Sequence, residues 1–562
     1  MRRPEKPLLT RRGFLRLLAA GGGLSLCAVR PSFPRTFDIP GEIHNPSPVA
    51  GHLLRGQQSW ASFPSVEGKP FDAVVIGGGI SGLSAAWKLE RAGVDRVLLL
   101  ELEEELGGNS ISGVQGSEAF PWAAHYINIP PQEADCIHEL LLDLGVIKGY
   151  DLQGRPEVAE ECLLRWPHER LAIDGEWVEG LDPFVGVSER EMETLRLFED
   201  DMLGWTLYRG RDGRRAFAMP LAYSTREERV RELDAITMEG YLRSRGWRSE
   251  RLDWLVDYAC RDDYGGLSSQ VSAWAGIHYW ACRFYDNRLW DEYPPDTLTW
   301  VEGNAFLARG LADRLKPGRC RTGCLVLRVE IDGAGLLIRF IDLKNGRQHA
   351  IRSRTAVYAG KLHTAPFVVQ GLPSKQREAM AGLTYSPWLV AAVHLSGLPD
   401  EKGRGMAWDN VFFGSPSLGY VRADHQDPRK DGRATLVYYR PFVDEVERAR
   451  RELLNQPHAY WVQMIMNDLC RFHPGLEELV ERVDVYRWGH AMVRPEPGVI
   501  WGETSRWRQR PLGGLAFATC DATGLPLFEE AVFSGVWGAE RCLQRLGIAH
   551  DSSLKGWGDD RG

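Results

Sequence analysis

The chain lacks the short motifs that mark several large classes of enzyme. It contains no C-x-x-C pair and no H-E-x-x-H sequence, so no metal site is expected. It contains no G-x-x-x-x-G-K-[ST] loop, which argues against a nucleotide hydrolase. No internal repeat is visible.

Basic runs, cysteines and long apolar stretches are also scarce. The formal net charge is −8 and no Lys/Arg-rich run occurs, so nucleic acid is not an expected partner. Among ten cysteines, Cys320 and Cys324 are close enough to bridge in an oxidising compartment, although scattered thiols are the expectation for the set. Beyond the N-terminal region, no stretch has the length of a transmembrane helix. At 562 residues and 44% hydrophobic content, the chain is expected to fold into more than one globular domain.

Residues 1–30 resemble a twin-arginine export signal. The sequence TRRGFLR, from Thr10 to Arg16, precedes a modest apolar stretch that three glycines interrupt. The twin-arginine route exports folded proteins, so its translocase is an expected partner and the periplasm the expected location. A basic tail without a targeting role is the alternative, and a retained or lipid-linked anchor stays open. Residues 31–69 are rich in Pro, Gly, Ser and His, and predict a linker or an extended arm.

The stretch FDAVVIGGGISG, from Phe71 to Gly82, predicts a strand, a tight glycine turn and a helix. Its first six residues are apolar with a β-branched bias, which suits a strand buried on both faces. The glycines fit G-x-G-x-x-G, where the first permits the turn, the second admits a pyrophosphate and the third lets the helix pack. The helix then offers free N–H groups to phosphates. The expected contacts are Gly77, Gly79, Ile80, Ser81 and Gly82.

An acidic residue follows the next predicted strand. Residues 96–100 read as a strand that ends at Glu101, roughly two dozen residues after the first glycine. This spacing is close to that of the acid that accepts a hydrogen bond from a ribose hydroxyl. A structural turn before an ordinary surface Glu is the alternative. Together the two strands, the turn and the acid predict an α/β, Rossmann-like dinucleotide-binding domain.

The next segments resemble those of the flavin-containing amine oxidases and their relatives, the phytoene desaturases and protoporphyrinogen oxidases. The sequence ELGGNS places Gly107 and Gly108 where this family lays a Gly-Gly pair against the phosphates and ribityl chain of FAD. Asn109 stands where Arg is usual, so a donor is kept and a positive charge is lost. The sequence FPWAAHYI resembles the segment beside the flavin ring, which makes His125 and Tyr126 candidates for facing substrate. Aromatic packing is the alternative for both.

The far end of the chain resembles the closing motif of the same family. Residues 515–520 predict a strand that ends at Asp521, and residues 529–546 predict a long helix. The resemblance implies that Asp521 lies near the pyrophosphate and ribityl, and that the helix start at Glu530 and Ala531 points N–H groups at the flavin ring. A surface strand and helix form the alternative. Val326 matches a residue whose backbone meets the adenine in relatives, with plain core packing as the alternative.

The resemblance implies a discontinuous FAD-binding domain and an α+β substrate domain. The expected FAD-binding segments are 70–130, 299–366 and 510–550, the substrate segments are 131–298 and 367–509, and 551–562 is a flexible tail. A capping box at Ser188-Glu189-Arg190-Glu191 predicts the start of a helix. Further expected helices begin near Thr237, Arg251 and Asn304, and expected strands cover residues 325–331, 336–343, 356–359, 389–395 and 435–439.

The implied activity is hydride transfer from a small organic substrate to FAD, with oxygen or a quinone as electron acceptor. The sequence RWGHA resembles a family strand near the ring and adds Trp488 and His490 as weak catalytic candidates. Val390 stands where amine oxidases often carry Lys, and Leu527 falls near one position of their aromatic cage, which weakens an amine substrate. Lys361 and His394 stay open as substitutes for that Lys.

Other interpretations of the whole chain stay open. It is alternatively an NAD(P)-dependent dehydrogenase, which needs only the glycine turn and its acid, or a flavin-binding envelope protein without catalysis. The sequence RDDYGG, from Arg261 to Gly266, is interpreted as a charged helix end before a core helix, with the lining of a substrate pocket as its alternative.

Overall fold

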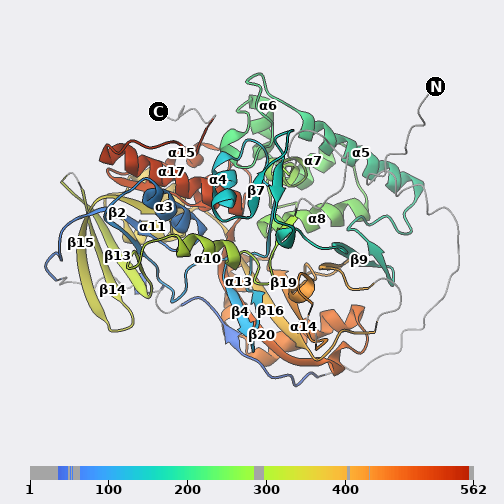
Figure 1. The fold of residues 1–562 in the computed structure, drawn as a ribbon. Helices are drawn as coiled ribbons and strands as arrows, with labels where there is room; N and C mark the ends of the chain where they lie inside the picture. Colours follow the sequence, from blue (N-terminus) through green and yellow to red (C-terminus); the bar gives the residue numbers. More distant parts are fainter. Residues whose placement is uncertain are drawn as a thin grey trace.

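The computed structural model describes residues 36–47, 51, 53–54, 64–283, 297–333, 335–400, 405–428 and 431–555. Two large sheets organise these residues, one of seven strands and one of eight. The smaller sheet lies on the left of Figure 1 and the larger one at the lower centre. The expected export signal, residues 1–30, lies outside the described residues.

The seven-stranded sheet joins segments from both ends of the chain. At its centre, β15 (Arg347–Tyr358) pairs in parallel with β2 (Phe71–Ile76) and with β21 (Leu515–Phe517). On the other side of β2 lie β3 (Val97–Leu100) and then β12 (Cys320–Arg321), both parallel. Antiparallel pairing of β15 with β14 (Gly335–Asp342), and of β14 with β13 (Cys324–Asp332), completes the sheet. The predicted α/β, Rossmann-like fold is confirmed.

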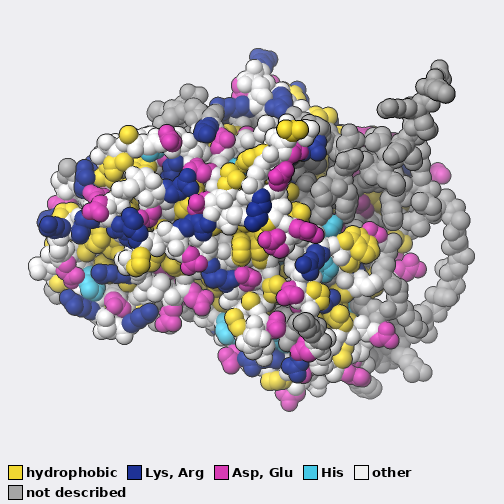
Figure 2. Space-filling model, in the orientation of Figure 1, with side chains coloured by type: hydrophobic (Ala, Val, Ile, Leu, Met, Phe, Trp, Pro, Cys, Tyr) yellow, Lys and Arg dark blue, Asp and Glu magenta, His cyan; other side chains and the backbone are white. Residues whose placement is uncertain are grey.

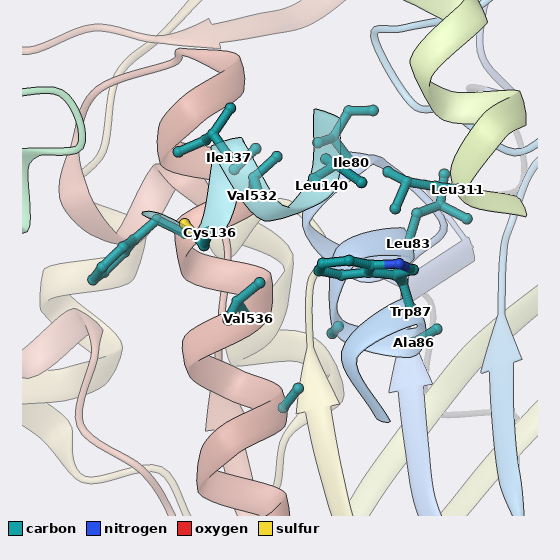
Figure 3. Close-up of a cluster of buried hydrophobic side chains, with 14 of the residues drawn as sticks. Ile80, Leu83, Ala86, Trp87, Cys136, Ile137, Leu140, Leu311, Val532 and Val536 are labelled. Atoms are coloured by element: carbon teal, nitrogen blue, oxygen red, sulfur yellow. The ribbon is translucent and has the colours of Figure 1, made fainter. Parts of the chain in front are cut away.

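Four helices pack together beside this sheet. They are α3 (Ile80–Arg91), α4 (Asp135–Asp143), α10 (Ala305–Asp313) and α17 (Phe528–Leu546). Figure 3 shows their apolar side chains converging around Trp87, with Leu140, Leu311 and Val536 from the other three helices. Each such fully buried side chain contributes roughly 1.5–3 kcal/mol. Helix α17, from the end of the chain, is therefore held against α3, from its beginning.

A glycine sets the distance between those two helices. A Cβ on Gly535 would lie 2.1 Å from the carbonyl oxygen of Ser81. Because no side-chain carbon tolerates that approach, only glycine lets α17 lie this close to the start of α3. The two ends of the chain thus meet at the glycine turn.

The eight-stranded sheet belongs to the expected substrate part of the molecule. Its strands, in spatial order, are β1 (Ile43–His44), β20 (Val480–Val493), β16 (Tyr385–Leu395), β19 (Ala434–Pro441), β18 (Tyr420–Arg422), β17 (Asp409–Phe412), β9 (Glu169–Ile173) and β10 (Glu176–Glu179). Strand β1 comes from the expected arm and pairs in parallel with β20. One face packs on α14 (His458–Phe472) through Trp461, Ile465 and neighbours. Trp388, Val390, Tyr439 and Trp488 lie on the other face.

Four helices come from the first insert: α5 (Glu189–Leu207), α7 (Met238–Ser244), α8 (Glu250–Tyr264) and α9 (Ala273–Ala281). Helix α8 packs on that second face through Trp254 and Tyr258, and the other three helices pack with α8 in a core of their own. The predicted capping box is confirmed, since the Ser188 hydroxyl accepts the Glu191 N–H at 3.3 Å and the Glu191 side chain accepts the Ser188 N–H at 3.1 Å. At the start of α7, the Thr237 hydroxyl accepts the Gly240 N–H at 3.0 Å, without a reciprocal side-chain bond. Sheet and helices together form the predicted α+β part.

The remaining strands and helices are short. The strands are β4 (Ser112–Gln115), β5 (Glu118–Pro121), β6 (Tyr126–Asn128), β7 (Ile147–Tyr150), β8 (Pro156–Val158) and β11 (Thr297–Thr299). The helices are α6 (Glu228–Arg231), α11 (Ala365–Val368), α12 (Ser374–Ala381), α13 (Val446–Asn455), α15 (Glu503–Arg508) and α16 (Cys520–Thr523).

Some predicted boundaries were wrong. The strand expected over 515–520 ends at Phe517, because residues 520–523 turn into α16, which stops at Gly524 with a left-handed φ of +90°. The strand expected over 356–359 is the end of a twelve-residue strand, β15. Within the expected tail, Ser553 and Leu554 are buried, and the Lys88 ammonium donates to the Asp551 carbonyl at 2.7 Å.

Cysteines and surface charge show no specialised feature. The nine cysteines among the described residues are free thiols, so Cys320 and Cys324 are not bridged. On the face drawn in Figure 2, acidic and basic side chains are interspersed. Of the helices that the structure describes, none combines the length and apolar character needed to cross a bilayer.

Candidate functional site

The glycine turn between β2 and α3 has the geometry that its sequence predicts. Gly77 has a φ of +105°, and a Cβ there would lie 2.9 Å from the backbone of Ala359. A Cβ on Gly82 would lie 1.9 Å from the carbonyl oxygen of Gly77. The first glycine therefore permits the turn, and the third lets the helix pack on it.

A second glycine segment closes against this turn. The Gly107 N–H donates to the Gly78 carbonyl at 2.8 Å, and a Cβ on Gly108 would meet the Gly79 Cα at 3.1 Å. The surface where these two glycine segments meet therefore consists of backbone atoms without side chains. The first intrahelical bond of α3 runs from the Leu83 N–H to the Gly79 carbonyl, and its first turn contains no acidic residue. The free N–H groups ahead of it suit a phosphate.

Glu101 ties the end of β3 to the glycine turn. Its carboxylate accepts the Gly78 N–H at 2.5 Å and the Glu103 N–H at 2.8 Å. Burial raises the pKa of this carboxyl from its ordinary value, and the two backbone donors oppose that effect. A carboxylate has lone pairs beyond these two bonds, so Glu101 retains acceptor capacity at the cavity wall.

One continuous cavity of about 500 Å³ runs from Glu101 to the larger sheet. Leu325 and Val326 line the end beside Glu101, and Tyr439 and Trp488 line the opposite end. The predicted cofactor residues on its wall are Gly77, Gly79, Ile80, Ser81, Glu101, Gly107, Gly108, Asn109, Val326 and Ala531. The structure therefore gathers these residues, from three distant parts of the sequence, around one space.

Three predicted cofactor residues do not line the cavity. Gly82 instead provides the close packing of α3. The Asp521 carboxylate accepts the Leu362 N–H at 3.0 Å and the Tyr385 hydroxyl at 2.6 Å, so it ties the segment after β15 to the start of β16. The Glu530 carboxylate accepts the Leu221 N–H. Helix α17 begins at Phe528, one residue before the predicted start at Glu529, and Glu529 and Ala531 line the cavity.

Asn109 and Lys361 meet at a single acceptor. The Asn109 amide donates to the Ala491 carbonyl at 2.8 Å, and the Lys361 ammonium donates to the same oxygen at 2.9 Å. Both side chains line the cavity. Lys361 thus puts a positive charge beside the position where Asn109 lacks one. His394, the other residue considered as a substitute for the Lys of amine oxidases, does not line this cavity. Its Nδ1 lies 3.1 Å from the Thr435 hydroxyl.

Three of the four weak catalytic candidates line the cavity, and His490 does not. His125 and Tyr126 precede and begin β6, and their rings lie 5.1 Å apart. The Trp488 indole donates to the Trp122 carbonyl at 3.0 Å. His490 instead stacks on His363 at 4.5 Å, outside the lining.

His125 is held as a neutral imidazole. Its Nδ1 lies 3.1 Å from the Ala123 carbonyl, which only accepts, so Nδ1 carries the proton and Nε2 is a free acceptor. Burial lowers the pKa of His125 to about 4. Tyr439 donates to the same carbonyl at 3.2 Å. A proton acceptor is therefore positioned on the cavity wall at neutral pH.

A cluster of four carboxylates, which was not predicted as a cluster from the sequence, lines the end of the cavity nearest the larger sheet. Asp262 and Asp263 come from the end of α8, Asp409 begins β17 and Glu529 lies in the first turn of α17. For RDDYGG, the pocket-lining alternative therefore describes the structure better. No local pattern marked Asp409, because only the strand pairing brings it opposite α8. Burial raises the pKa of both Asp262 and Glu529 to about 7.

The residues around the cavity fit FAD. Bare glycine backbone and the start of α3 suit the pyrophosphate, and Glu101 suits a ribose hydroxyl. Apolar and aromatic walls continue beyond them toward the larger sheet, which leaves space for a flat ring system and a substrate.

Sequence comparison matches short parts of the chain. Residues 75–144 match the family of NAD(P)-binding Rossmann-like domains. A stretch of 46 residues is 59% identical to amine oxidase [flavin-containing] A of Canis lupus familiaris. That stretch is 8% of this chain, and the chain spans 8% of the length of that relative.

Comparison with solved structures covers most of the chain. A double mutant of putrescine oxidase matches with a TM-score of 0.64 at 17% identity, over 84% of this chain and 99% of that one. Cyclohexylamine oxidase from Brevibacterium oxydans IH-35A matches with a TM-score of 0.62 at 16% identity, over 85% and 100%. A CLA-producing fatty acid isomerase from P. acnes matches with a TM-score of 0.57 at 17% identity, over 84% and 98%. The chain therefore has the fold that these three proteins share.

Proposed function

We propose that this protein is an FAD-dependent oxidoreductase that removes a hydride from a small organic substrate. One observation carries the proposal: the glycine turn, Glu101, the Gly-Gly pair and an aromatic-walled space line a single cavity. An NAD(P)-dependent dehydrogenase needs only the first two of these features. The shared fold with two amine oxidases supports flavin chemistry in this cavity.

Some residues of the cavity would bind the cofactor, and others would orient the substrate. The bound flavin supplies the hydride acceptor. Gly79, Ile80 and Ser81 would bind its pyrophosphate through backbone N–H groups, and Glu101 would accept a hydrogen bond from its ribose. Lys361 adds a positive charge to the same wall, close to the Asn109 amide. The tryptophans and tyrosines of the larger sheet exclude water and orient the substrate.

His125 is the residue best placed to take a proton from the substrate. Its Nε2 is unprotonated at neutral pH, and its ring is fixed between Tyr126 and Tyr439, whose centroids lie 5.1 and 4.8 Å away. A positioned base of this kind typically contributes about 10²–10⁴-fold to a rate. His125→Gln keeps a hydrogen-bonding group and removes the base.

Anaerobic reduction of the bound flavin tests the proposed function. The purified protein is mixed with panels of amines, polyenes and porphyrinogens, and loss of flavin colour identifies a substrate. Reoxidation with oxygen and with a quinone then identifies the electron acceptor. A coloured protein that none of these compounds reduces would favour a non-catalytic flavin-binding role. A colourless protein that binds NAD(P) would favour the dehydrogenase alternative.

We also propose export by the twin-arginine route, with the periplasm as the site of action. The support is the TRRGFLR sequence, which lies outside the described residues. Replacing both Arg11 and Arg12 by Lys should leave the protein in the cytoplasm, as cell fractionation would show. Unchanged export of this variant would contradict the proposal.

A further inference from the structure

The N-terminal arm, here residues 36–47, 51, 53 and 54, runs from the larger sheet to the cavity. Its strand β1 forms the edge of that sheet beside β20. The Glu42 carbonyl accepts the Val485 N–H at 2.9 Å. The Asn45 side chain accepts the Arg487 guanidinium at 2.6 Å. The arm is therefore fixed on the sheet edge before it reaches the cavity.

Beyond β1, the arm binds the segment that follows β3. The Ser47 N–H donates to the two oxygens of the Glu103 carboxylate at 3.0 and 3.1 Å, and the Ser47 hydroxyl donates to the same carboxylate at 2.9 Å. The Glu103 N–H in turn donates to the Glu101 carboxylate at 2.8 Å. Ser47 is therefore linked, through Glu103, to the acid that would accept a hydrogen bond from the cofactor ribose.

The end of the arm forms part of the cavity wall. Gly51 and Leu54 both line the cavity. The Leu54 side chain is 7% exposed and belongs to the same apolar cluster as Val326, which lies at the end beside Glu101. The neighbouring Leu53 is 39% exposed and does not line the cavity. One apolar side chain of the arm thus faces the end that would hold the adenosine.

Both contacts would strengthen the binding of a dinucleotide at this end. A base that covers Leu54 removes apolar surface from water, which is favourable. The Glu103 N–H opposes the effect of burial on the pKa of Glu101, so a fixed Glu103 helps Glu101 to remain a charged acceptor. Each contact is lost when the cofactor leaves, so each slows its release.

We infer that the N-terminal arm retains FAD by its adenosine end. Leu54 forms the part of the wall that the arm supplies, and Ser47 is a positioning residue that acts through Glu103 on Glu101. The inference rests on the FAD-dependent function proposed above. It assigns the arm, which precedes the glycine turn in the sequence, to cofactor retention in addition to its place in the larger sheet.

The rate of FAD release from the diluted full-length holoprotein tests the role of Leu54. Free FAD is detected by the gain in flavin fluorescence. Leu54→Ala should release FAD about tenfold faster than the wild type, the scale of the apolar contact of one leucine. Leu53→Ala is the matched control and should release FAD at the wild-type rate. Equal rates for Leu54→Ala and the wild type, or an equal acceleration in Leu53→Ala, would overturn the role of Leu54.

Two substitutions of Ser47 test the second contact. Ser47→Ala removes the hydroxyl donor to Glu103 and should accelerate FAD release at least about threefold, the scale of one hydrogen bond. Ser47→Thr retains a hydroxyl and should restore most of the wild-type rate. The circular dichroism spectrum should stay unchanged in both variants. A wild-type rate in Ser47→Ala, or equal rates for the Ala and Thr variants, would overturn the positioning role.

FMN separates retention of the adenosine from a general loosening of the fold. Because FMN lacks the adenosine, its affinity for the flavin-free protein should be the same in the wild type, Leu54→Ala and Ser47→Ala. An equal loss of affinity for FMN and FAD would overturn the inference. A protein that takes up neither flavin contradicts the proposed function and this inference with it. Bound FAD that leaves the wild type and both variants at one rate contradicts this inference alone.

Discussion

At the scale of single residues, the positions that tolerate substitution least are two glycines whose Cβ would collide with backbone atoms. A Cβ on Gly82 would lie 1.9 Å from a backbone carbonyl, and neither β2 nor α3 can move away without opening the turn. Because Gly82 has no Cβ, the turn can form and the helix can pack on it. We therefore expect both flavin binding and stability to require glycine at this position. The same argument applies to Gly535, which faces the carbonyl of Ser81 from α17.

Gly82→Ala should destabilise the protein by about 1–3 kcal/mol, the usual cost of overpacking a well-packed core, and should lower its flavin content. Chemical denaturation and the visible spectrum measure the two effects. Gly204→Ala is the matched control, because that glycine lies within α5 with no atom within 4 Å of its added Cβ. The control should be neutral or gain up to about 1 kcal/mol through helix propensity. Equal stability of Gly82→Ala and the wild type would contradict the packing role.

Asp262 should make stability depend on pH. Its pKa is raised by burial from 3.8 to about 7, so the folded protein holds this proton more tightly than the unfolded chain does. The stability that it contributes is complete below about pH 4 and is lost as the pH rises to about 7. Asp262→Asn removes this loss, so the free energy of unfolding of the variant relative to the wild type should grow between pH 5 and pH 8. The slope reaches at most about 1.4 kcal/mol per pH unit.

Denaturation curves at several pH values measure that difference. Asp427→Asn should show none of the trend, because its carboxylate is exposed to solvent. A constant difference between Asp262→Asn and the wild type across this range would show that Asp262 titrates normally.

How far single residues are predictable depends on the range of the forces that act on them. The roles of Gly77 and Gly82 follow from local backbone sterics, so the sequence pattern was sufficient. Asp409 faces the cavity only because β17 pairs with β9 and β18. The residues next to Asp409 in the sequence give no indication of this pairing. Asp521 was expected at the cofactor by resemblance, yet its carboxylate is held by Tyr385 and the Leu362 N–H.

At the scale of helices and strands, local signals located starts better than ends. The Ser188 capping box predicted the start of α5, because both hydrogen bonds connect residues three apart. The strand expected over 515–520 was too long, since its apolar residues continue into α16 after sheet pairing ends at Phe517. The length of β15 depends on its pairing with β2, β14 and β21, which no local pattern contains.

Ser188→Ala should destabilise the protein by about 1 kcal/mol, the typical value of an N-cap side chain. The Ser188 hydroxyl accepts the Glu191 N–H, and Ala leaves that donor without its acceptor. Ser188→Asp retains an acceptor at the same place and should restore most of the loss. Thermal unfolding of the three proteins measures the effect, and equal midpoints for Ser188→Ala and the wild type would show that the cap contributes nothing.

At the scale of the whole molecule, the two ends of the chain form one site. Strands β2 and β21 both pair with β15, and α3 packs on α17. Composition alone indicated only a multidomain globular protein, and the meeting of the ends was expected from family resemblance. The cavity between the two sheets then joins the glycine turn to the carboxylates of the larger sheet. The glycine turn and these carboxylates therefore lie at different ends of one cavity.

The FAD content of the purified full-length protein tests the central claim most directly. We expect one equivalent of FAD per chain, released on denaturation and identified by chromatography, and a much lower content in Gly82→Ala than in Gly204→Ala. A colourless protein that takes up no FAD when the cofactor is added would contradict the account.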